Sequence, residues 1–525
     1  MCSHPPDTSG RIDRILGWWP SFMKIYRAPK QAEMQGVLLY SGQVIIVLAA
    51  VMLLPSLLGL LLNERSVAVD FFLSAAITSF SGLILMLIGQ NGERNLNWTQ
   101  GMVVAAFSWL LCTLLGAIPY VLSGYWLSYL DAVFDVMSGY TTTGLSLVQD
   151  IDHLPDAINT YRMLLSWLGG QGMVVLALTF FVRSMPGVFT LYASEGKDER
   201  LAPNVVNTTR AIWYISVVYL VVGTALLWLV GVNQGLTLGR GFLHALWVFM
   251  AAWSTGGFAP QSQNILYYHS FIFEITTALF FILGSMNFNL HWAVWTGNRR
   301  EIYRNLEAVT FTVASTVLAT IVIWGLANDG TYSGAAALFR KGYYMLMSAY
   351  TTTGFGTNYA RQFVLDWGAL PFVAIIIAML FGGSASSTAG GFKAIRVGLV
   401  FKAIMHDVRR LLLPERAVVV QRFHMFRSAT LDDGMARAVM TIIIMYTALW
   451  AFTTLVATMF GYDLASAAFE AASVTGNVGL SAGLTSAGMP WGLKIVYILA
   501  MWLGRLEFMA IWVFIGYVCT ILRRR

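Results

Sequence analysis

Long apolar runs alternate with short polar stretches along this chain, and their order begins with a pair. A membrane-spanning helix needs about 20 predominantly apolar residues. The first two runs of that length lie at about 44–62 and 71–89, and the polar residues 63–65 join them. They predict an opening transmembrane hairpin.

Four units of one kind follow the hairpin. Each unit has a long apolar run, a shorter apolar segment, a Thr-Gly stretch, polar residues and a second long run. The shorter segments, of about ten residues, cannot span a bilayer, so we expect re-entrant half-helices. The successive segments are 101–122, 130–137 and 159–182; 211–232, 241–252 and 270–295; 306–326, 335–349 and 369–400; and 436–460, 464–472 and 491–522.

This order predicts an all-α integral membrane protein. We expect the opening two-helix hairpin and four pseudo-fourfold repeats of helix, half-helix, filter and helix around one pore. The hairpin and two spans per repeat give ten spans, with both termini on one side. The expected parts are 1–95 for a leader and the hairpin, 96–205 for repeat 1, 206–303 for repeat 2, 304–432 for repeat 3 with a basic loop, and 433–525 for repeat 4.

The Thr-Gly stretch is the motif that returns in every unit. Residues 138–146 are Ser-Gly-Tyr-Thr-Thr-Thr-Gly-Leu-Ser, residues 350–356 nearly repeat them, and 253–258 and 473–479 keep a Thr-Gly centre. A single such stretch is typical of an ordinary extracellular turn. Four at equivalent positions instead indicate one repeated unit. Aligning them on the Thr-Gly centre makes four glycines equivalent, namely Gly144, Gly256, Gly354 and Gly476.

These stretches have the chemistry of a site for a hard cation. A ring of inward-facing backbone carbonyls can replace the water around a dehydrated cation. Glycine allows the positive φ angles that turn successive carbonyls inward, and threonine adds hydroxyl oxygens. Oxygen ligands suit alkali and alkaline-earth ions rather than copper or zinc. A half-helix that ends at the stretch would direct its partial negative charge at the cation.

Composition supports a membrane protein. Of the 525 residues, 57% are hydrophobic and 11% are charged, with a mean hydropathy of +0.66, whereas soluble proteins have about 25% charged residues. Cys2, Cys112 and Cys519 are too far apart in sequence to predict a disulfide or zinc framework. Residues 1–30 have no apolar core and predict a short cytoplasmic leader rather than a signal peptide.

Basic residues gather on one side of the predicted topology. Because cytoplasmic loops are enriched in Lys and Arg, that side is expected to be cytoplasmic, with both termini there and the Thr-Gly stretches descending from the outer face. The same bias explains the net charge of +7 without a nucleic acid. The basic residues on that side are Lys24, Arg27, Lys30, Arg183, Lys197, Arg200, Arg210, Arg299, Arg300, Arg304, Lys402, Arg409, Arg410, Arg416, Arg422, Arg427 and Arg523–Arg525; the exceptions are Arg65, Arg162, Arg240, Arg340 and Lys341.

The fourfold order of span, half-helix, filter and span resembles the Trk/Ktr/HKT superfamily of potassium transporters over about residues 40–520. The opening hairpin and the loop after repeat 3 resemble its TrkH/TrkG branch. The resemblance implies potassium uptake across a bacterial inner membrane through one pore, and assembly as a homodimer. The filter residues that it implies for K⁺ are Thr142, Thr143, Gly144, Ser254, Thr255, Gly256, Thr352, Thr353, Gly354, Val474, Thr475 and Gly476.

Two details of the filter refine this expectation. In plant relatives a serine at the first filter glycine accompanies sodium transport, so Gly144 favours potassium. The residues after the four glycines are Leu145, Gly257, Phe355 and Asn477, which departs from a strict potassium-channel filter. Fewer ordered ion sites than in a channel with four identical strands are therefore expected.

A run of small residues at 382–391 interrupts the second apolar run of repeat 3. Each glycine costs about 1 kcal/mol relative to alanine inside a helix. An unwound loop under the filter is therefore favoured over close helix packing, the alternative assigned to the Gly-Gly-Gln-Gly stretch at 169–172. The resemblance implies an intramembrane gating loop here, with Gly382, Gly383, Gly390, Gly391 and Lys393 as gate candidates.

Charged residues also lie in the predicted membrane segments. Arg505 and Glu507 interrupt the last apolar run, where a charge costs at least about 2.5 kcal/mol. They are two positions apart and so lie on different helix faces. We expect Arg505 to face the cavity, where the family has an arginine acting as an electrostatic barrier, and Glu507 to bind a neighbouring helix. Asp131, Asp135 and Glu470 either stabilise the filter surroundings or attract cations to the outer mouth.

The segment 393–437 carries nine basic and four acidic residues. It is typical of a loop attracted to anionic headgroups or of a dock for a soluble regulator. The resemblance implies a cytosolic TrkA-type nucleotide-binding subunit as partner. The chain has no G-x-G-x-x-G motif after a strand, so nucleotide sensing would have to come from that partner. Two other functions are weighed, a coupled transporter of another small cation or solute and an intramembrane enzyme. The seven unclustered histidines disfavour the enzyme. Coupling to Na⁺ or H⁺, as in a symporter, stays open.

Overall fold

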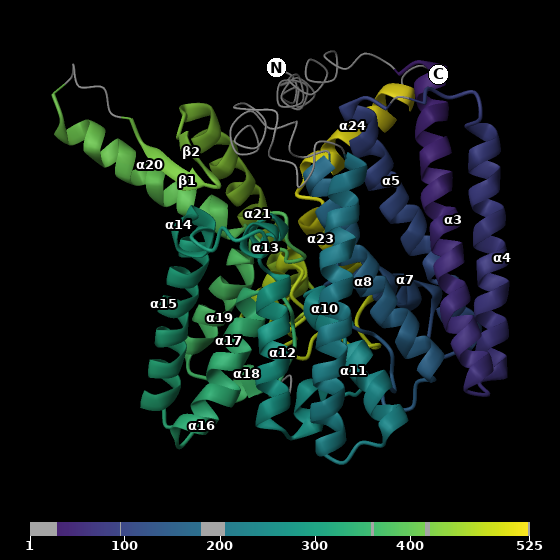
Figure 1. Ribbon diagram of the computed structural model, residues 1–525, viewed down its shortest axis with the longest axis horizontal. Coiled ribbons are helices and arrows are strands. Elements are labelled where there is room, and N and C mark those ends of the chain that lie inside the picture. The colour runs from purple at the N-terminus through teal and green to yellow at the C-terminus, as the bar shows by residue number, and fades with distance from the viewer. Residues whose placement is uncertain (1–28, 95, 180–204, 359–361, 415–419, 523–525) are drawn as a thin grey trace, which may run out of the picture.

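The computed structural model describes residues 29–94, 96–179, 205–358, 362–414 and 420–522. The predicted leader up to residue 28 and the basic residues at 183, 197, 200, 416 and 523–525 lie outside them. The regular secondary structure of the described residues is helical (Figure 1), apart from one antiparallel hairpin of β1 (Arg422–Met425) and β2 (Arg427–Thr430). The predicted all-α class is therefore confirmed.

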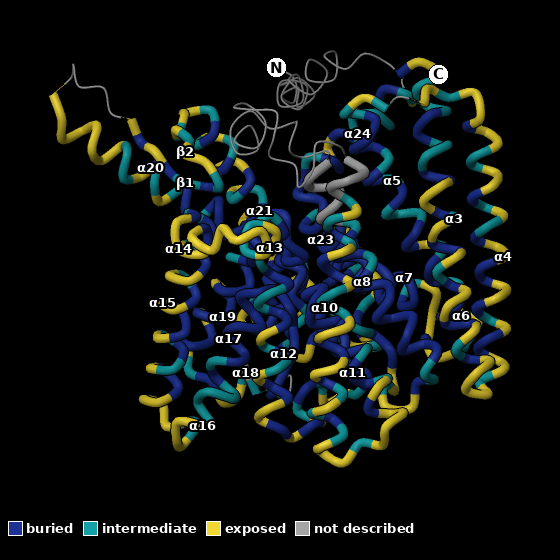
Figure 2. The backbone as a smooth tube through the Cα atoms, in the orientation of Figure 1, coloured by how far each residue is buried: buried dark blue, intermediate teal, exposed yellow. Residues whose placement is uncertain are grey.

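The opening hairpin consists of α3 (Gln31–Leu61) and α4 (Arg65–Ile88), which lie side by side at one edge of the molecule (Figure 1). Glycines allow this close approach, since a Cβ on Gly42 would lie 2.7 Å from the carbonyl oxygen of Gly82. Many outward-facing residues of both helices are apolar and exposed (Figure 2), as expected for a surface that meets lipid.

Each of the four repeats begins with a long helix and a half-helix. The half-helix of repeat 3 is one continuous run that includes a π-helical turn. The long helices are α5 (Trp98–Gly116), which is followed by α6 (Ile118–Ser123), α10 (Val205–Asn233), α15 (Leu306–Asn328) and α21 (Asp433–Met459). The half-helices are α7 (Tyr129–Tyr140), α11 (Leu238–Trp253), α16 (Ala335–Ala337) with η3 (Leu338–Tyr343) and α17 (Tyr344–Tyr350), and α22 (Leu464–Gly476).

The second run differs among the repeats. In repeat 1 it is the unbroken α8 (Asp156–Thr179). In repeat 3, residues 382–393 separate α19 (Ala369–Phe381) from α20 (Ala394–Leu412). In repeat 2, α12 (Phe271–Gly284) and α13 (Phe288–Trp295) meet at a bend of 99°, and in repeat 4, α23 (Trp491–Arg505) and α24 (Met509–Leu522) meet at 112°. The apolar runs predicted at 270–295 and 491–522 are therefore each bent into two helices.

Local chemistry explains both bends. The side chain of Asn287 accepts the N–H of Asn289 and so starts α13 as a new helix. Glu507 and Phe508 have φ angles of 52° and 66°, which no α-helix allows. Six described helices are long and apolar enough to cross a membrane, or up to eight if each bent pair is one span. The count of ten stays a prediction.

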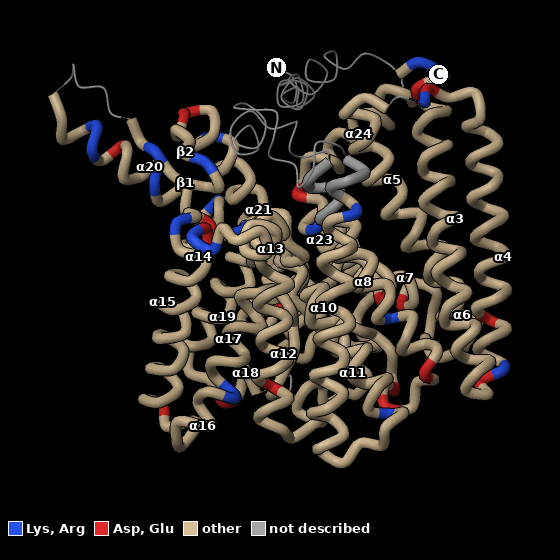
Figure 3. The backbone as a smooth tube through the Cα atoms, in the orientation of Figure 1, with Lys and Arg blue, Asp and Glu red and all other residues tan. Residues whose placement is uncertain are grey.

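The remaining short elements are η2 (Asn264–Tyr268), α14 (Glu301–Arg304) and α18 (Gln362–Leu365). Charged residues gather at two opposite ends of the molecule. Figure 3 shows a long, nearly uncharged middle zone, with Lys and Arg clustered at the end that carries α14, α20 and the β-hairpin. The buried core lies in this middle zone, around the ends of the half-helices (Figure 2).

Candidate functional site: a ring of four Thr-Gly strands

The four Thr-Gly stretches, called strands 1 to 4 after their repeats although they are not β-strands, converge and form a closed ring. The glycine of each strand lies so close to the next strand that an added Cβ would meet a backbone carbonyl oxygen there. These distances are 2.4 Å from Gly144 to Gly256, 2.1 Å from Gly257 to Thr353, 2.0 Å from Gly354 to Val478 and 2.0 Å from Gly479 to Thr143. Because the last contact returns to the first strand, the four strands enclose one narrow axis.

Backbone geometry defines three equivalent positions in each strand, numbered two to four here. The residue at position two has a left-handed φ, position three donates its N–H to the carbonyl five residues earlier at 2.8 Å, and position four is a glycine with positive φ. Position two is Thr142, Thr255, Thr352 and Asn477; position three is Thr143, Gly256, Thr353 and Val478; position four is Gly144, Gly257, Gly354 and Gly479.

This register corrects the alignment on the Thr-Gly centre. The alignment was right for repeats 1 and 3, but in repeat 2 it was one residue early, and in repeat 4 three residues early. Gly257 and Gly479, not Gly256 and Gly476, are the equivalents of Gly144. In repeat 4 the half-helix continues through residues 474–476, and Asn477 takes the left-handed turn. Asparagine tolerates that conformation better than most residues, so it can replace threonine there.

The half-helices and second helices support the ring from behind. Each half-helix ends at its strand, and its C-terminal carbonyls carry partial negative charge. Glycines let the second helices approach these ends. A Cβ on Gly169 would lie 2.0 Å from the carbonyl oxygen of Tyr140, and one on Gly504 would lie 2.2 Å from that of Thr475. The packing role assigned to residues 169–172 is thus confirmed at Gly169.

Residues 382–393 form an unwound loop against one end of the ring, as predicted. The backbone N–H of Gly390 donates to the Thr352 hydroxyl at 2.7 Å. The Thr388 hydroxyl lies 3.2 Å from that of Thr255, and it donates to the carbonyl of Trp253 at 3.0 Å. Gly390 cannot carry a side chain, because its Cβ would lie 2.2 Å from the carbonyl oxygen of Gly476.

Buried charges surround this loop. Arg505 is 2% exposed and donates from Nη1 to the carbonyl of Thr388 at 2.7 Å. Glu507 pairs with Arg396 of α20, which confirms that Glu507 binds a neighbouring helix. Lys393 has a φ of 75° and donates to the carbonyl of Ala389. Glu307 of α15 accepts from the loop at Ala385 N and from Asn287 at 3.1 Å.

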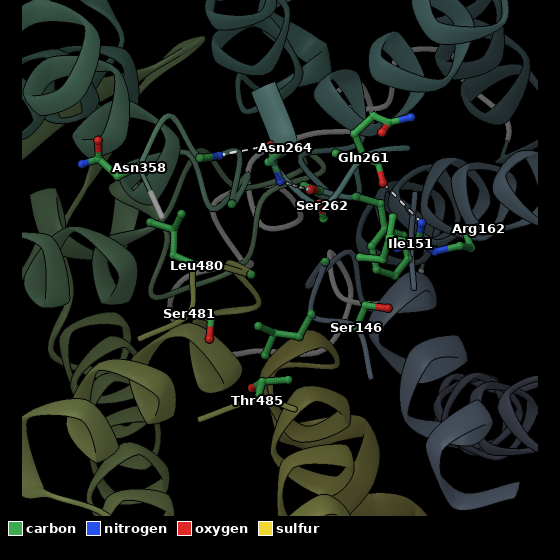
Figure 4. A pocket seen from close by; sticks show the side chains of 18 of the residues that line it. Ser146, Ile151, Arg162, Gln261, Ser262, Asn264, Asn358, Leu480, Ser481 and Thr485 are labelled. Atoms are coloured by element: carbon green, nitrogen blue, oxygen red, sulfur yellow. Dashed lines mark hydrogen bonds between the residues drawn. The ribbon is translucent and has the colours of Figure 1, made fainter. Parts of the chain in front are cut away.

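A polar cavity of about 210 Å³ opens at the other end of the ring (Figure 4). Arg162, which the charge pattern left as an outer exception, lines it and is 1% exposed. Its guanidinium donates to the carbonyl of Ala259 at 3.3 Å and lies 4.6 Å from the centre of the Phe258 ring. Residues 479–483 also match the G-x-S-x-G sequence pattern of serine hydrolases. The match is one of sequence alone, because the hydroxyl of Ser481 donates to Glu470 in the wall of this mouth.

The fold and the ring together define the class: a polytopic membrane protein in which four re-entrant half-helices meet at one narrow, glycine-lined site. Within this class the chain belongs to the TrkH family of cation transport proteins, whose family model matches residues 68–327 and 305–517. It is therefore a transport protein and not an enzyme.

Individual relatives agree with this assignment. The chain is 31% identical to the Trk system potassium uptake protein TrkH of Halomonas elongata, covering 89% of this chain and 95% of that one. It is 29% identical to an uncharacterized cation transporter of Methanocaldococcus jannaschii, over 92% and 96% of the two chains. The crystal structure of the potassium transporter TrkH from Vibrio parahaemolyticus shares the fold, with a TM-score of 0.79 at 24% identity, and the match covers 91% of this chain and 98% of that one.

Several residues of the ring escaped the sequence argument. Gly257 and Gly479 were visible as glycines just after the aligned centre, but nothing in the sequence says where each half-helix ends. Thr388 lies within the small-residue run without a distinguishing mark, although it contacts two carbonyls and the Thr255 hydroxyl.

Proposed function

We propose that this chain is the membrane subunit of a potassium uptake system and carries K⁺ through the ring. The observation that carries the proposal is the closed set of contacts linking Gly144, Gly257, Gly354 and Gly479. Strands that approach so closely through bare glycines leave room for backbone oxygens around an ion and for little else. The relatives named as potassium uptake proteins support K⁺ as the ion, which is transported cargo rather than a cofactor.

The oxygens that would hold K⁺ come from positions two to four of each strand. Repeats 1 and 3 supply them from the residues expected from the sequence, and repeats 2 and 4 from shifted ones. Ser254, Val474, Thr475 and Gly476 precede these positions and leave the set. The proposed set is Thr142, Thr143, Gly144, Thr255, Gly256, Gly257, Thr352, Thr353, Gly354, Asn477, Val478 and Gly479.

The gate in this proposal is the loop 382–393 together with Arg505. The loop hydrogen-bonds Thr352 through Gly390, so an ion that leaves the ring on that side must displace it. Gly382, Gly383 and Gly391 let the two ends of the loop approach each other closely. Arg505 adds a buried positive charge beside the loop, and such a charge opposes the passage of a cation.

Orientation and assembly complete the proposal. The end with α20 and the β-hairpin carries most of the described Lys and Arg (Figure 3), which favours that end, and both termini, on the cytoplasmic side of a bacterial inner membrane. The segment 393–437 at this end would contact a cytosolic TrkA-type regulatory subunit. We further propose a homodimer, in which each chain contains its own pore.

Complementation tests the proposed function. In a bacterium that lacks its own potassium uptake systems, this chain should restore growth at low external K⁺, whereas a Gly354→Val variant should not, because its side chain would meet the Val478 carbonyl. Flux of K⁺, Rb⁺ and Na⁺ into liposomes that contain the purified protein should favour K⁺. Repeating it without a Na⁺ or H⁺ gradient separates a channel from a coupled symporter. Growth that stays K⁺-limited despite full expression would contradict the proposal.

A further inference from the structure

Two buried carboxylates lie behind the outer ends of strands 1 and 4. Asp135 on α7 and Glu470 on α22 are each 0% exposed, and each precedes the position-two residue of its own strand by seven positions. They are therefore equivalent residues of two repeats. The ring contact from Gly479 to Thr143 shows that strands 1 and 4 are neighbours.

Both carboxylates bind the chain that continues beyond the filter glycine. Asp135 accepts the hydroxyl of Ser146 at 2.6 Å and the N–H of Leu147 at 2.7 Å. Glu470 accepts the hydroxyl of Ser481 and, at 3.0 Å, the N–H of Leu484. Ser146 and Ser481 each follow the filter glycine by two positions, and both lie at the cavity rim (Figure 4).

Repeats 2 and 3 lack this device. The equivalent residue in repeat 3 is Met345, whose sulfur, a weak acceptor, receives the N–H of Thr357 at 3.1 Å. In repeat 2 it is Val248, which has no acceptor. The residue equivalent to Leu147 and Thr357 is there Pro260, which has no N–H to offer. The acceptor behind the strand is thus missing in the repeat that has no donor.

Further contacts divide the ring into two halves. Asn477 of strand 4 donates to the Thr143 hydroxyl at 3.1 Å, which joins strands 4 and 1. Asn264 accepts the N–H of Gly356 at 3.2 Å and donates to the carbonyl of Gly257 at 3.3 Å, which joins strands 2 and 3. Among the described residues, the hydrogen bonds from the 382–393 loop to position two reach repeats 2 and 3.

We propose that Asp135 and Glu470 are positioning residues that fix the outer ends of strands 1 and 4, and through them the preference of the ring for K⁺ over Na⁺. This inference rests on the proposed K⁺ transport. The half-ring of repeats 1 and 4 is held by its own half-helices, whereas the other half-ring is tied to the loop. The sequence left these carboxylates with two roles, and the contacts assign them to the filter wall.

The physical reason lies in how a filter discriminates between ions. Carbonyl oxygens held at the spacing of K⁺ cannot close around the smaller Na⁺, but a strand that loses its anchor can. The hydrogen bonds that these carboxylates accept, two at Asp135 and four at Glu470, therefore resist inward movement of the carbonyls at Gly144 and Gly479.

Amide and alanine variants separate positioning from charge. In Asp135→Asn and Glu470→Gln, the amide oxygen still accepts the backbone N–H groups, and the amide NH₂ donates to a hydroxyl that can rotate. Asp135→Ala and Glu470→Ala remove every bond. We expect the alanine variants to lower the K⁺ to Na⁺ flux ratio in liposomes by about tenfold, which equals ~1.4 kcal/mol, and the amide variants to keep it within about twofold.

Val248→Ala is the matched control, because it truncates the equivalent side chain of repeat 2 without removing an acceptor, and its flux ratio should equal the wild type. Should the alanine variants fail to fold, Ser146→Ala and Ser481→Ala each remove one bond and should lower the ratio about threefold. Amide variants that lose as much selectivity as alanine variants would show that charge is decisive, and would overturn the inference. Alanine variants that keep the wild-type flux ratio would overturn this inference and leave the proposed function intact. A wild type that does not favour K⁺ would overturn both.

Discussion

The glycine at position four of each strand meets two constraints at once. Its φ lies in the left-handed region, from 63° at Gly257 to 95° at Gly479. A Cβ added to this glycine would lie too close to the carbonyl oxygen of the next strand, at only 2.4 Å even in the most open case, Gly144. That oxygen belongs to the backbone, so a larger residue must displace the strand itself rather than a flexible side chain.

At this scale we predict that Gly144→Ser admits Na⁺. The serine Cβ would push the Gly256 carbonyl away from the axis and disfavour a φ of 88°. The ring then loses its fixed spacing, and the K⁺ over Na⁺ preference should fall by on the order of tenfold. Tracer uptake of both ions measures it. Gly488→Ser is the matched control, because a Cβ at Gly488 meets nothing within 4 Å; an unchanged preference in Gly144→Ser would contradict the prediction.

Individual residues also show how far the sequence could lead. The Thr-Gly motif identified strands 1 and 3 to the residue, and the charge spacing assigned Glu507 to another helix. Strand 4 could not be placed, because Val-Thr-Gly at 474–476 looks like a filter but is the last turn of a helix. The decision lies in packing, where Gly504 approaches the Thr475 carbonyl, and no local pattern in the sequence encodes that contact.

Among the structural elements, the 382–393 loop connects segments of different repeats. Thr388 at its centre touches three other elements, through the carbonyls of Trp253 at the end of α11 and Gly284 at the end of α12, and through Arg505 of α23. Repeats 2 and 4 are therefore linked through a segment of repeat 3. Because the loop has no helical hydrogen bonds of its own, it is held by contacts with other elements, which include these and the backbone N–H bonds from Ser384 to Ser285 and from Gly390 to Thr352.

We therefore predict that Arg505→Ala raises K⁺ flux. The change removes the bond to the Thr388 carbonyl and a buried charge near the ion path. At an effective dielectric of about 20 such a charge is worth more than ~1 kcal/mol, so an increase on the order of tenfold is expected. Flux into liposomes measures it at matched protein content. Arg240→Ala, which removes an exposed arginine paired with Asp156, should leave flux unchanged. A well-folded Arg505→Ala protein that is no faster would remove Arg505 from the gate.

The element scale also shows where pattern reasoning fails. The small-residue run predicted the loop, because glycine and serine are poor helix formers. The bends before α13 and α24 were missed, since apolar residues resume directly after the polar residues at each bend, so each run was taken as one segment. Glu507 and Phe508 leave the helix, and the ion pair of Glu507 with Arg396 of α20 holds that turn. This partner is over a hundred residues distant, so hydropathy cannot reveal it.

For the whole molecule, a buried ion pair supports the closure of the ring. Repeats 1 and 4 are the first and last of the chain and must meet for the pore to close. Where they meet, Lys494 of α23 donates to Asp131 of α7 at 2.5 Å, and both side chains are buried, at 9% and 2% exposure. Four repeats predicted a closed ring, but this pair spans 363 positions and only the folded structure shows it.

Removing one partner of this pair should destabilise the molecule. Lys494→Met leaves Asp131 buried without its cation, which typically costs ~3–5 kcal/mol, whereas the double variant Asp131→Asn/Lys494→Met should recover most of that loss, because no charge remains uncompensated. Arg240→Ala breaks an exposed pair and should cost no more than ~1 kcal/mol. Thermal unfolding of the purified proteins in detergent, with K⁺ held constant, gives the order of stability of these variants. A Lys494→Met protein as stable as Arg240→Ala would mean that closure depends on packing between α7 and α23 and not on their charges.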